Sequence, residues 1–206
     1  MKILLFGGTF DPPHQGHMNN LRAAMQAVRP DRVIVMPAGI PPHKQASTTP
    51  GEVRLAMCRC FLALGKEVEL SDWEITHAGR SYTYNTLTML AQANPGAQLY
   101  MTVGSDMLET FTRWYRWQDI LRLAALVVQS REEGDEQALR AAAGELEAAG
   151  GRILFAHAAA LPCASSDIRA GKYTPQQLKE LLPPPVPELI RQNHLYGLYE
   201  SEEKAQ

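Results

Sequence analysis

The sequence predicts an α/β domain built on a doubly wound, mostly parallel β-sheet with helices on both faces. Short apolar, β-rich segments recur along the chain, and segments with helical periodicity lie between most of them. This alternation is typical of right-handed βαβ units. The run Leu123–Val128 is apolar throughout, as expected of a strand that helices cover on both sides. The predicted strands are Ile3–Phe6, Arg32–Met36, Glu67–Leu70, Gln98–Val103, Ala124–Gln129 and Arg152–Phe155, and the predicted helices are residues 16–28, 51–64, 83–93 and 135–149.

Two of the predicted helices contain residues whose roles the pattern suggests. In the helix over 51–64, Cys58 and Cys60 fall on apolar positions and are expected to pack in the interior. The helix over 135–149 is rich in Ala and Glu, and its two leucines lie one heptad apart. We interpret it as a solvated surface helix without a functional role.

The C-terminal part is expected to be small and helical. Pro183–Pro185 predicts a stiff turn before a last helix near Val186–Gln192. No linker divides the chain and no internal repeat is present. We therefore expect a single domain over residues 1–200, followed by a disordered tail over residues 201–206.

Composition and charge exclude several classes of protein. The 206 residues are 45% hydrophobic, which is enough for a sizeable core. A net charge of −2 and a pI of about 6.3 argue against a general nucleic-acid binder, so an anion site must be a local cluster. No apolar run is long enough for a membrane span or a secretory signal. The three cysteines lack zinc-type spacing and predict reduced thiols in a cytoplasmic protein.

The most informative segment is GGTFDPPHQGH, residues 7–17, directly after the first predicted strand. The apolar spacing downstream predicts a helix that begins after His14. A glycine turn leading into a helix leaves backbone N–H groups pointing at one place, with the positive end of the helix dipole behind them. His14 and His17 add side-chain donors there. The segment therefore predicts a nucleotide or phosphate site at the end of the first strand.

The two histidines alone also fit a helix cap or a metal pair. A metal site needs a third ligand, and the zinc-protease pattern has Glu after the first histidine and a four-residue spacing. Here Gln15 follows His14, and His17 comes three residues after His14. From these residues alone the metal pair stays open.

Ligands of open α/β sheets bind outside the carboxyl ends of the strands, so the loops after other strands are informative. Residues 37–44 follow the second strand, and their prolines present Lys44 as a point charge suited to phosphate or simply solvated. Residues 103–106 follow the fourth strand. There Gly104 permits close backbone approach, and the Asp106 carboxylate suits a ribose hydroxyl or a helix cap.

Three later segments add polar or aromatic groups. Residues 79–86 form a polar loop that turns into a helix, whose N–H groups and hydroxyls suit a carboxylate or amide ligand, or cap the helix. Residues 113–117 interleave three aromatics with two arginines and suit a flat heterocycle, although core packing explains one tryptophan equally well. Residues 163–169 place two hydroxyls at a helix start with Arg169 one turn later, a second anion-binding group or a capped surface helix.

Residues 8–12 and 14–17, taken with Ser165–Arg169, resemble the nucleotidyltransferase superfamily that carries a His-x-Gly-His motif. The resemblance is close for one branch, the bacterial nicotinate-nucleotide adenylyltransferases, and extends from Met1 to about Tyr196. It implies a Rossmann-like fold. Further matches to this branch are Pro41–Lys44, Ser81–Thr83, Gly104–Asp106, Trp114, Arg131 and Leu181–Pro183.

The resemblance implies that nicotinate mononucleotide and ATP give deamido-NAD and pyrophosphate. The attacking phosphate is already an anion, so catalysis rests on alignment and charge neutralisation. Mg²⁺ is expected, bound mainly through the ATP phosphates with no protein metal site. The expected partners are these small molecules, with no nucleic acid or membrane, and the sequence leaves a homo-oligomer open.

The resemblance also implies roles for residues of this chain. His14, His17, Lys44 and Arg169 are the implied catalytic residues. The implied ATP-binding residues are Gly7, Gly8, Thr9, Phe10, His14, His17, Gly104, Asp106, Ser165, Ser166, Ile168 and Arg169. The implied acceptor-binding residues are Thr9, Lys44, Tyr82, Thr83, Trp114 and Arg131.

Three positions depart from the pattern of the branch. Ser166 stands where Thr is common, and Cys163–Ala164 replaces an isoleucine–serine pair, so one hydroxyl is absent. Asn85 stands where Asp is usual, which leaves the preference for the acid or the amide mononucleotide open. The alternatives are a pantetheine-phosphate or flavin-mononucleotide adenylyltransferase, or a catalytically silent nucleotide-binding regulator.

Overall fold

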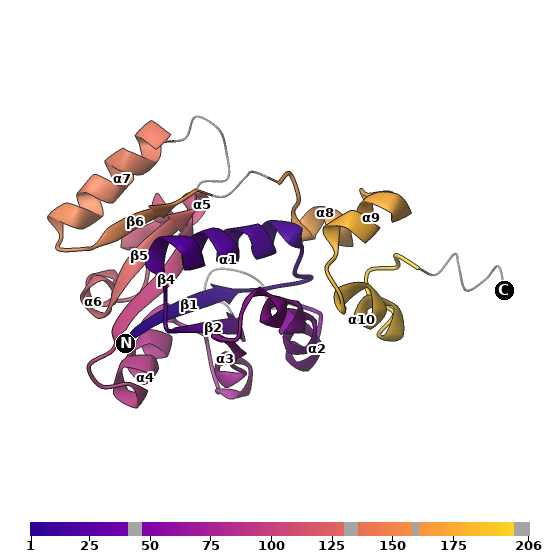
Figure 1. The fold of residues 1–206 in the computed structure, drawn as a ribbon, viewed down its shortest axis with the longest axis horizontal. Coiled ribbons are helices and arrows are strands. Elements are labelled where there is room, and N and C mark those ends of the chain that lie inside the picture. The colour runs from indigo at the N-terminus through magenta and orange to yellow at the C-terminus, as the bar shows by residue number, and fades with distance from the viewer. Residues whose placement is uncertain (41–46, 130–135, 158–160, 200–206) are drawn as a thin grey trace.

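The structure, a computed structural model, describes residues 1–40, 47–129, 136–157 and 161–199. Six strands form one sheet, and its pairs are parallel throughout the described part of the chain. The strand order is β3-β2-β1-β4-β5-β6 (Figure 1). The first three strands are added toward one edge of the sheet and the last three toward the other, so the order of strand addition reverses between β1 and β4. The predicted α/β class is confirmed. The strands are β1 (Lys2–Gly8), β2 (Arg32–Pro37), β3 (Val68–Leu70), β4 (Gln98–Gly104), β5 (Ala124–Gln129) and β6 (Ile153–Ala156).

Helices cover both faces of the sheet. Figure 1 shows α1 and α4 on opposite sides of it, with α8, α9 and α10 gathered at one end of the molecule. The α-helices are α1 (Gln15–Val28), α2 (Gly51–Met57), α3 (Trp73–Thr76), α4 (Thr83–Ala93), α5 (Ser105–Leu108), α6 (Trp117–Leu123), α7 (Glu136–Ala148), α8 (Ser165–Arg169), α9 (Pro175–Leu181) and α10 (Val186–Gln192). Two 3-10 helices are η1 (Cys58–Leu64) and η2 (Phe111–Arg113).

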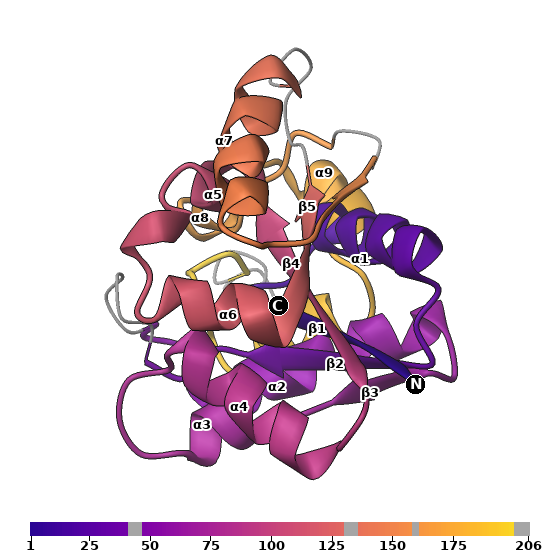
Figure 2. The ribbon, with the colours of Figure 1, turned by 90° about the vertical axis from the view of Figure 1, so that its left-hand side faces the viewer.

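The side chains of β1 alternate between two hydrophobic cores. Leu4 and Phe6 pack with α1, η1 and the C-terminal helices on one face. Ile3 and Leu5 pack with α4, α6 and α7 on the other, and Figure 2 shows α4 and α6 on the side of the sheet away from α1. Alternation follows from the two-residue repeat of a strand. Because both faces are covered, the carboxyl end of β1 is the part of the strand that can meet a ligand.

The predicted helix over residues 51–64 is divided in the structure. Its second half, η1, has the three-residue turn of a 3-10 helix, which brings side chains three apart onto one side. Cys58, Phe61 and Leu64 follow that spacing and pack into the same core. Cys58 and Cys60 are buried, which confirms the prediction that they are packing residues.

Helix α7 differs from the predicted solvated helix on one face. Leu139, Ala143 and Leu146 are each no more than 2% exposed, and the two leucines pack into the core that contains α4 and α6. Burial of each leucine contributes about 1.5–3 kcal/mol. The heptad spacing of the two leucines therefore marks a docked face.

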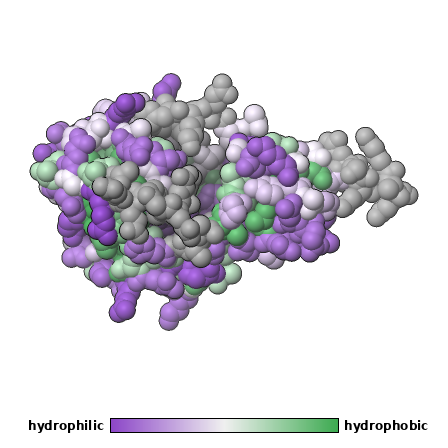
Figure 3. All heavy atoms as spheres, turned by 90° about the horizontal axis from the view of Figure 1, so that it is seen from above, coloured by the Kyte–Doolittle hydropathy of each residue, from purple (hydrophilic) through white to green (hydrophobic). Residues whose placement is uncertain are grey.

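The surface seen in Figure 3 is largely hydrophilic, with apolar residues in small separate areas. Within the described ranges, no helix has both the length and the apolar character needed to cross a membrane. The predicted tail over residues 201–206 lies outside the described residues.

Candidate active site

A cavity of about 1230 Å³ lies at the carboxyl ends of β1 and β4, where the strand order reverses. Lys44 and Arg131, both predicted site residues, lie outside the described residues. Ile168 does not line this cavity, because its side chain is fully buried in the core beside α1. The other predicted site residues all line it: Gly7, Gly8, Thr9, Phe10, His14, His17, Tyr82, Thr83, Gly104, Asp106, Trp114, Ser165, Ser166 and Arg169.

The turn after β1 is held by aromatic packing. Phe10 adopts a left-handed conformation with φ of 50°, and its buried ring lies 5.4 Å from Phe6 and 5.2 Å from Phe61, measured between ring centroids. Such a backbone is strained for a residue with a side chain. A Cβ at Gly8 would lie 2.9 Å from the Phe10 ring, so the glycine lets this ring fold back over the strand end. The aromatic contacts thereby fix the backbone that faces the cavity.

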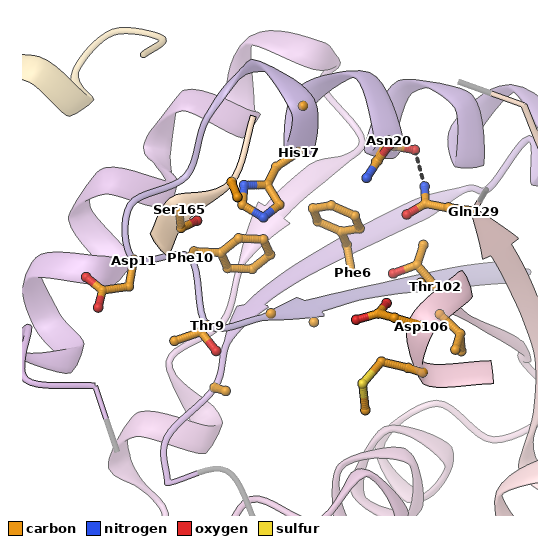
Figure 4. A pocket seen from close by; sticks show the side chains of 18 of the residues that line it. Phe6, Thr9, Phe10, Asp11, His17, Asn20, Thr102, Asp106, Gln129 and Ser165 are labelled. Atoms are coloured by element: carbon orange, nitrogen blue, oxygen red, sulfur yellow. Dashed lines mark hydrogen bonds between the residues drawn. The ribbon is translucent and has the colours of Figure 1, made fainter. Parts of the chain in front are cut away.

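The two histidines lie side by side at the start of α1. Their ring centroids are 3.8 Å apart, and the His14 backbone N–H donates to Nδ1 of His17 at 3.3 Å. Because Nδ1 accepts, a neutral His17 ring carries its proton on Nε2. Figure 4 shows the His17 ring in the cavity beside Phe10, on the side where Ser165 lies. His17 thus presents a donor at the positive end of α1.

Helix α8 is tied to the turn after β1 by two side chains. Ser165 Oγ donates to the carbonyl oxygen of Pro12 at 2.9 Å, and the Arg169 guanidinium donates to the carbonyl oxygen of Asp11 at 2.6 Å. These bonds span more than 150 residues of sequence. The structure therefore brings together the two segments that the sequence predicts to bind anions.

The carboxylate of Asp11 is the centre of a buried network behind this turn. It is 5% exposed and accepts hydrogen bonds from Ser47 Oγ at 2.8 Å and from the Tyr196 hydroxyl at 2.5 Å. Burial and the bond to Asp11 both raise the pKa of Tyr196. Tyr196 therefore acts as a donor to this carboxylate.

Arg54, in α2, supports the same turn. Its guanidinium donates to the carbonyl oxygens of Thr9 at 2.9 Å and of Thr49 at 3.2 Å. Burial lowers the pKa of Arg54, and the nearby Asp11 charge opposes that shift. Removal of either Arg54 or Asp11 would leave the other charge buried without compensation, which would lower the stability of the fold.

Across the cavity lies the end of β4. Figure 4 shows Thr102 and Asp106 on this side, with Gln129 at the end of β5. Gln129 is 4% exposed and donates to the carbonyl oxygen of Asn20 in α1 at 2.5 Å. Asp106 is exposed and lies in the first turn of α5, whose N-cap is Gly104.

The two segments predicted to hold the acceptor also meet. The Tyr115 ring lies 4.9 Å from Tyr82 and 6.1 Å from Tyr84, and the Arg116 guanidinium lies 4.1 Å above the Tyr84 ring. Trp114 lines the cavity and also packs on Phe111 at 5.0 Å. The packing role considered for the aromatic patch is present, and stacking on a flat heterocycle stays a prediction that the position of Trp114 at the cavity allows.

Several cavity residues were not predicted from the sequence. They come from different elements and carry polar groups: Asn20, Glu74, Thr102, Gln129 and Tyr173. The sequence offers a signal for Gln129 alone, which is a polar residue at the end of an apolar strand. Within the described ranges, no group of three His, Cys, Asp or Glu side chains comes together as a metal site.

Comparison with known proteins agrees with this geometry. Residues 5–171 match the family model described as Cytidylyltransferase-like. A protein of Acidithiobacillus ferrooxidans named "Probable nicotinate-nucleotide adenylyltransferase" is 36% identical over 94% of this chain and 95% of its own length. A protein of Trichlorobacter lovleyi with the same name is 34% identical over 95% of this chain and 99% of its own length.

A solved structure shares the fold. It is titled "Plasmodium falciparum nicotinic acid mononucleotide adenylyltransferase complexed with NaAD" and superposes with a TM-score of 0.77 over 96% of this chain and 98% of its own. Its sequence identity of 18% supports the fold alone. The family model matches residues 5–171, and the two bacterial proteins match 94% and 95% of this chain. This chain therefore belongs to the Cytidylyltransferase-like family and, within it, to the nicotinate-nucleotide adenylyltransferases.

Proposed function

We propose that this protein transfers the adenylyl group of ATP to nicotinate mononucleotide, which yields deamido-NAD and pyrophosphate. One observation carries the proposal. One side of the cavity is formed by residues 7–17 and 165–169, the two predicted anion-binding segments, which hydrogen-bond to each other. Another side is formed by the aromatic rings and backbone amides of residues 82–83 and 114. Such a cavity suits two substrates that react through their phosphates.

The reaction needs alignment more than acid–base chemistry. An oxygen of the mononucleotide phosphate forms a bond to the α-phosphorus of ATP, and the bond between the α-phosphorus and the bridging oxygen breaks. Pyrophosphate leaves with that electron pair. Because the attacking phosphate is already an anion, no side chain has to remove a proton. The protein's part is to hold both groups in line and to offset charge on the phosphates.

The residues of this chain divide between the two substrates. His14, His17, Ser166 and Arg169 donate to the triphosphate from both sides, with His17 Nε2 stabilising charge that develops on the leaving group. Ser165 holds α8 against the turn after β1 through its bond to Pro12. Lys44 adds positive charge. The backbone of Gly7–Phe10 and the turn Gly104–Asp106 hold the rest of the nucleotide.

The acceptor lies against α4 and the aromatic segment. The N-cap of α4, Tyr82, makes no side-chain hydrogen bond to the helix, so amide groups of the first turn are available for the nicotinate carboxylate. Thr83 contributes from this turn, and Trp114 stacks on the pyridine ring. Thr9 and Arg131 are the remaining residues assigned to the acceptor, and Arg131 lies outside the described residues.

Mg²⁺ fits the donor set of the cavity as an ion carried mainly by ATP. The described lining offers Asp106 as an exposed carboxylate rather than a cage of acidic groups. Mg²⁺ prefers oxygen ligands, keeps several waters and neutralises phosphate charge when bound.

We infer a cytoplasmic enzyme that acts as one unit over residues 1–200. Three free cysteines support a reducing compartment.

The test is pyrophosphate release with ATP, Mg²⁺ and one of four acceptors: nicotinate mononucleotide, nicotinamide mononucleotide, phosphopantetheine or flavin mononucleotide. Release is expected with nicotinate mononucleotide above all others, and deamido-NAD should form in equal amount. Omission of the acceptor is the control. Preference for another acceptor would overturn the substrate assignment, and no release with any of them would overturn the enzyme activity itself.

A further inference from the structure

Glu74 is a partly buried residue at the acceptor end of the cavity that no sequence motif pointed to. It lies in the short helix α3 and lines the cavity together with Tyr82 and Thr83. The Thr86 hydroxyl donates to Glu74 Oε1 at 2.6 Å. The Gly39 backbone N–H donates to Ser81 Oγ at 3.2 Å, and the Ser81 hydroxyl and this N–H both act to lower the pKa of the Glu74 carboxyl group.

These bonds connect three separate segments: the loop after β2, the loop before α4, and α4 itself. Ser81 N–H donates to the carbonyl oxygen of Ile40 at 2.8 Å, so the two loops are also joined through their backbones. The segments are closely packed. A Cβ at Gly39 would lie 2.0 Å from the Glu74 carbonyl oxygen and 2.8 Å from Ser81 Oγ. Only glycine fits there without a shift of the backbone around Glu74.

The contact with Thr86 fixes the first turn of α4. Thr86 is fully buried, and its backbone N–H bonds to the carbonyl oxygen of Tyr82, the N-cap. The Glu74 carboxyl group therefore holds the helix one turn from the amide groups that face the cavity. A shift of about 1 Å in such groups is enough to weaken a ligand contact markedly.

The charge of Glu74 also bears on an anionic acceptor. An uncompensated carboxylate at this end of the cavity would repel the carboxylate of nicotinate. The Thr86 hydroxyl donates to this carboxyl group instead, with the Ser81 hydroxyl and the Gly39 N–H nearby. Burial raises the pKa of Glu74, while these groups oppose the shift. The donors thus offset the charge of Glu74, and the N–H groups of α4 are left to receive the acceptor.

We propose that Glu74 is a positioning residue for the acceptor, which fixes Ser81 and the first turn of α4 in the geometry that receives the nicotinate carboxylate. This inference rests on the proposed function, since it takes residues 81–83 as the acceptor site. Glu74 touches neither reacting phosphate and acts through Ser81 and Thr86.

The sharpest test removes single hydrogen bonds from this group. Thr86→Val keeps the shape of the side chain and loses the hydroxyl, and Thr86→Ser keeps the hydroxyl. Glu74→Gln replaces one carboxyl oxygen by an amide nitrogen, which donates hydrogen bonds and cannot accept them. The matched control is Glu69→Gln, because Glu69 is a carboxylate in β3 that pairs with Arg32 and does not line the cavity.

The expected result is a separation of the two substrates. Thr86→Val and Glu74→Gln should raise KM for nicotinate mononucleotide about tenfold, the change that a loss of roughly 1.4 kcal/mol produces. KM for ATP should stay within twofold. Thr86→Ser and Glu69→Gln should stay near wild type for both substrates, and calorimetric titration of the mononucleotide should show the same order.

Three outcomes would overturn the inference. In one, folded Thr86→Val and Glu74→Gln bind both substrates as wild type does. In another, KM rises equally for ATP and the mononucleotide, as a general structural defect would cause. In the third, Thr86→Ser is as impaired as Thr86→Val. A wild-type protein that releases no pyrophosphate with nicotinate mononucleotide would instead remove the proposed function, and the inference with it.

Discussion

The Tyr196 hydroxyl donates a hydrogen bond to the Asp11 carboxylate at 2.5 Å, which joins the C-terminal segment to the turn after β1. The same turn receives Arg169, whose guanidinium donates to the Asp11 carbonyl oxygen. Asp11 therefore links a residue that faces the cavity to one behind it. The position of the phosphate-binding backbone depends on chain segments up to 185 residues away.

Tyr196→Phe tests the strength of this link. The variant keeps the ring and leaves a buried carboxylate without one donor, which costs about 1–3 kcal/mol of the free energy of unfolding. Urea unfolding measures the loss, and KM for ATP should rise several-fold because the turn loosens. Tyr100→Phe is the control, since the Tyr100 hydroxyl has only a long 3.4 Å contact with Gln98. Equal losses in the two variants would contradict a special role for Tyr196.

The same link predicts a dependence on alkaline pH. Because the pKa of Tyr196 is raised from 10.0, its contribution to stability is complete below about pH 10 and is lost as pH rises through the higher folded value. The stability difference between wild type and Tyr196→Phe should therefore be constant near neutral pH and shrink above pH 10. A constant difference up to pH 11.5 would speak against the assignment.

His17→Ala is expected to lower kcat by two or more orders of magnitude with the fold retained. The reason is the loss of one donor aimed at charge that develops in the transition state. Steady-state kinetics with nicotinate mononucleotide measure it, and thermal unfolding verifies the fold. His157→Ala is the control, because His157 is exposed and does not line the cavity. A folded His17→Ala variant with near-normal kcat would remove His17 from its assigned role.

Trp114 is expected to act on the acceptor more than on ATP. Stacking of one aromatic ring contributes about 0.5–1.5 kcal/mol, so Trp114→Ala should raise KM for the mononucleotide roughly 3- to 10-fold. Trp114→Phe should retain part of the effect. Trp117→Phe serves as the control because Trp117 packs in the core and does not line the cavity. Equal changes in both KM values would favour a packing role alone.

The sequence predicted the fold well because burial leaves a periodic pattern. Strands covered on both faces, such as β5, appear as unbroken apolar runs, and the spacing of Met18 and Leu21 marked α1. Helices of four or five residues, such as α3 and α5, are too short to show a period. The sequence pattern therefore does not predict them as helices, although it does single out Gly104 and Asp106 around α5.

The candidate site was predictable where its residues are consecutive. The segment 7–17 carries its chemistry in one stretch, and resemblance to a family connected it with 165–169. Glu74 and Tyr196 had no such signal, because their partners are set by tertiary contacts that a single sequence does not reveal. Ile168 shows the opposite limit. It lies between cavity residues in the sequence, but the helical turn of α8 points its side chain into the core.

Cys163 offers a chemical probe of the cavity. It lines the cavity beside Ala164 and is partly exposed, whereas Cys58 and Cys60 are buried. Burial raises the pKa of the Cys163 thiol to about 11, despite a hydrogen bond with Tyr173. The thiolate is the reactive form. At pH 8 the thiolate fraction is roughly a hundredfold smaller than for an ordinary thiol with a pKa of about 8.5.

A disulfide reagent such as Ellman's should therefore label one thiol slowly at pH 8 in the native protein, and all three after unfolding. The rate should rise about tenfold per pH unit up to about pH 11, where Cys163 titrates. ATP should slow the reaction, because the nucleotide would occupy the same cavity. Cys163→Ser should abolish the slow phase and Cys60→Ser should leave it unchanged. If ATP does not affect the labelling, Cys163 lies away from the bound nucleotide. That result would also contradict the proposal that the neighbouring residues 165–169 bind the triphosphate.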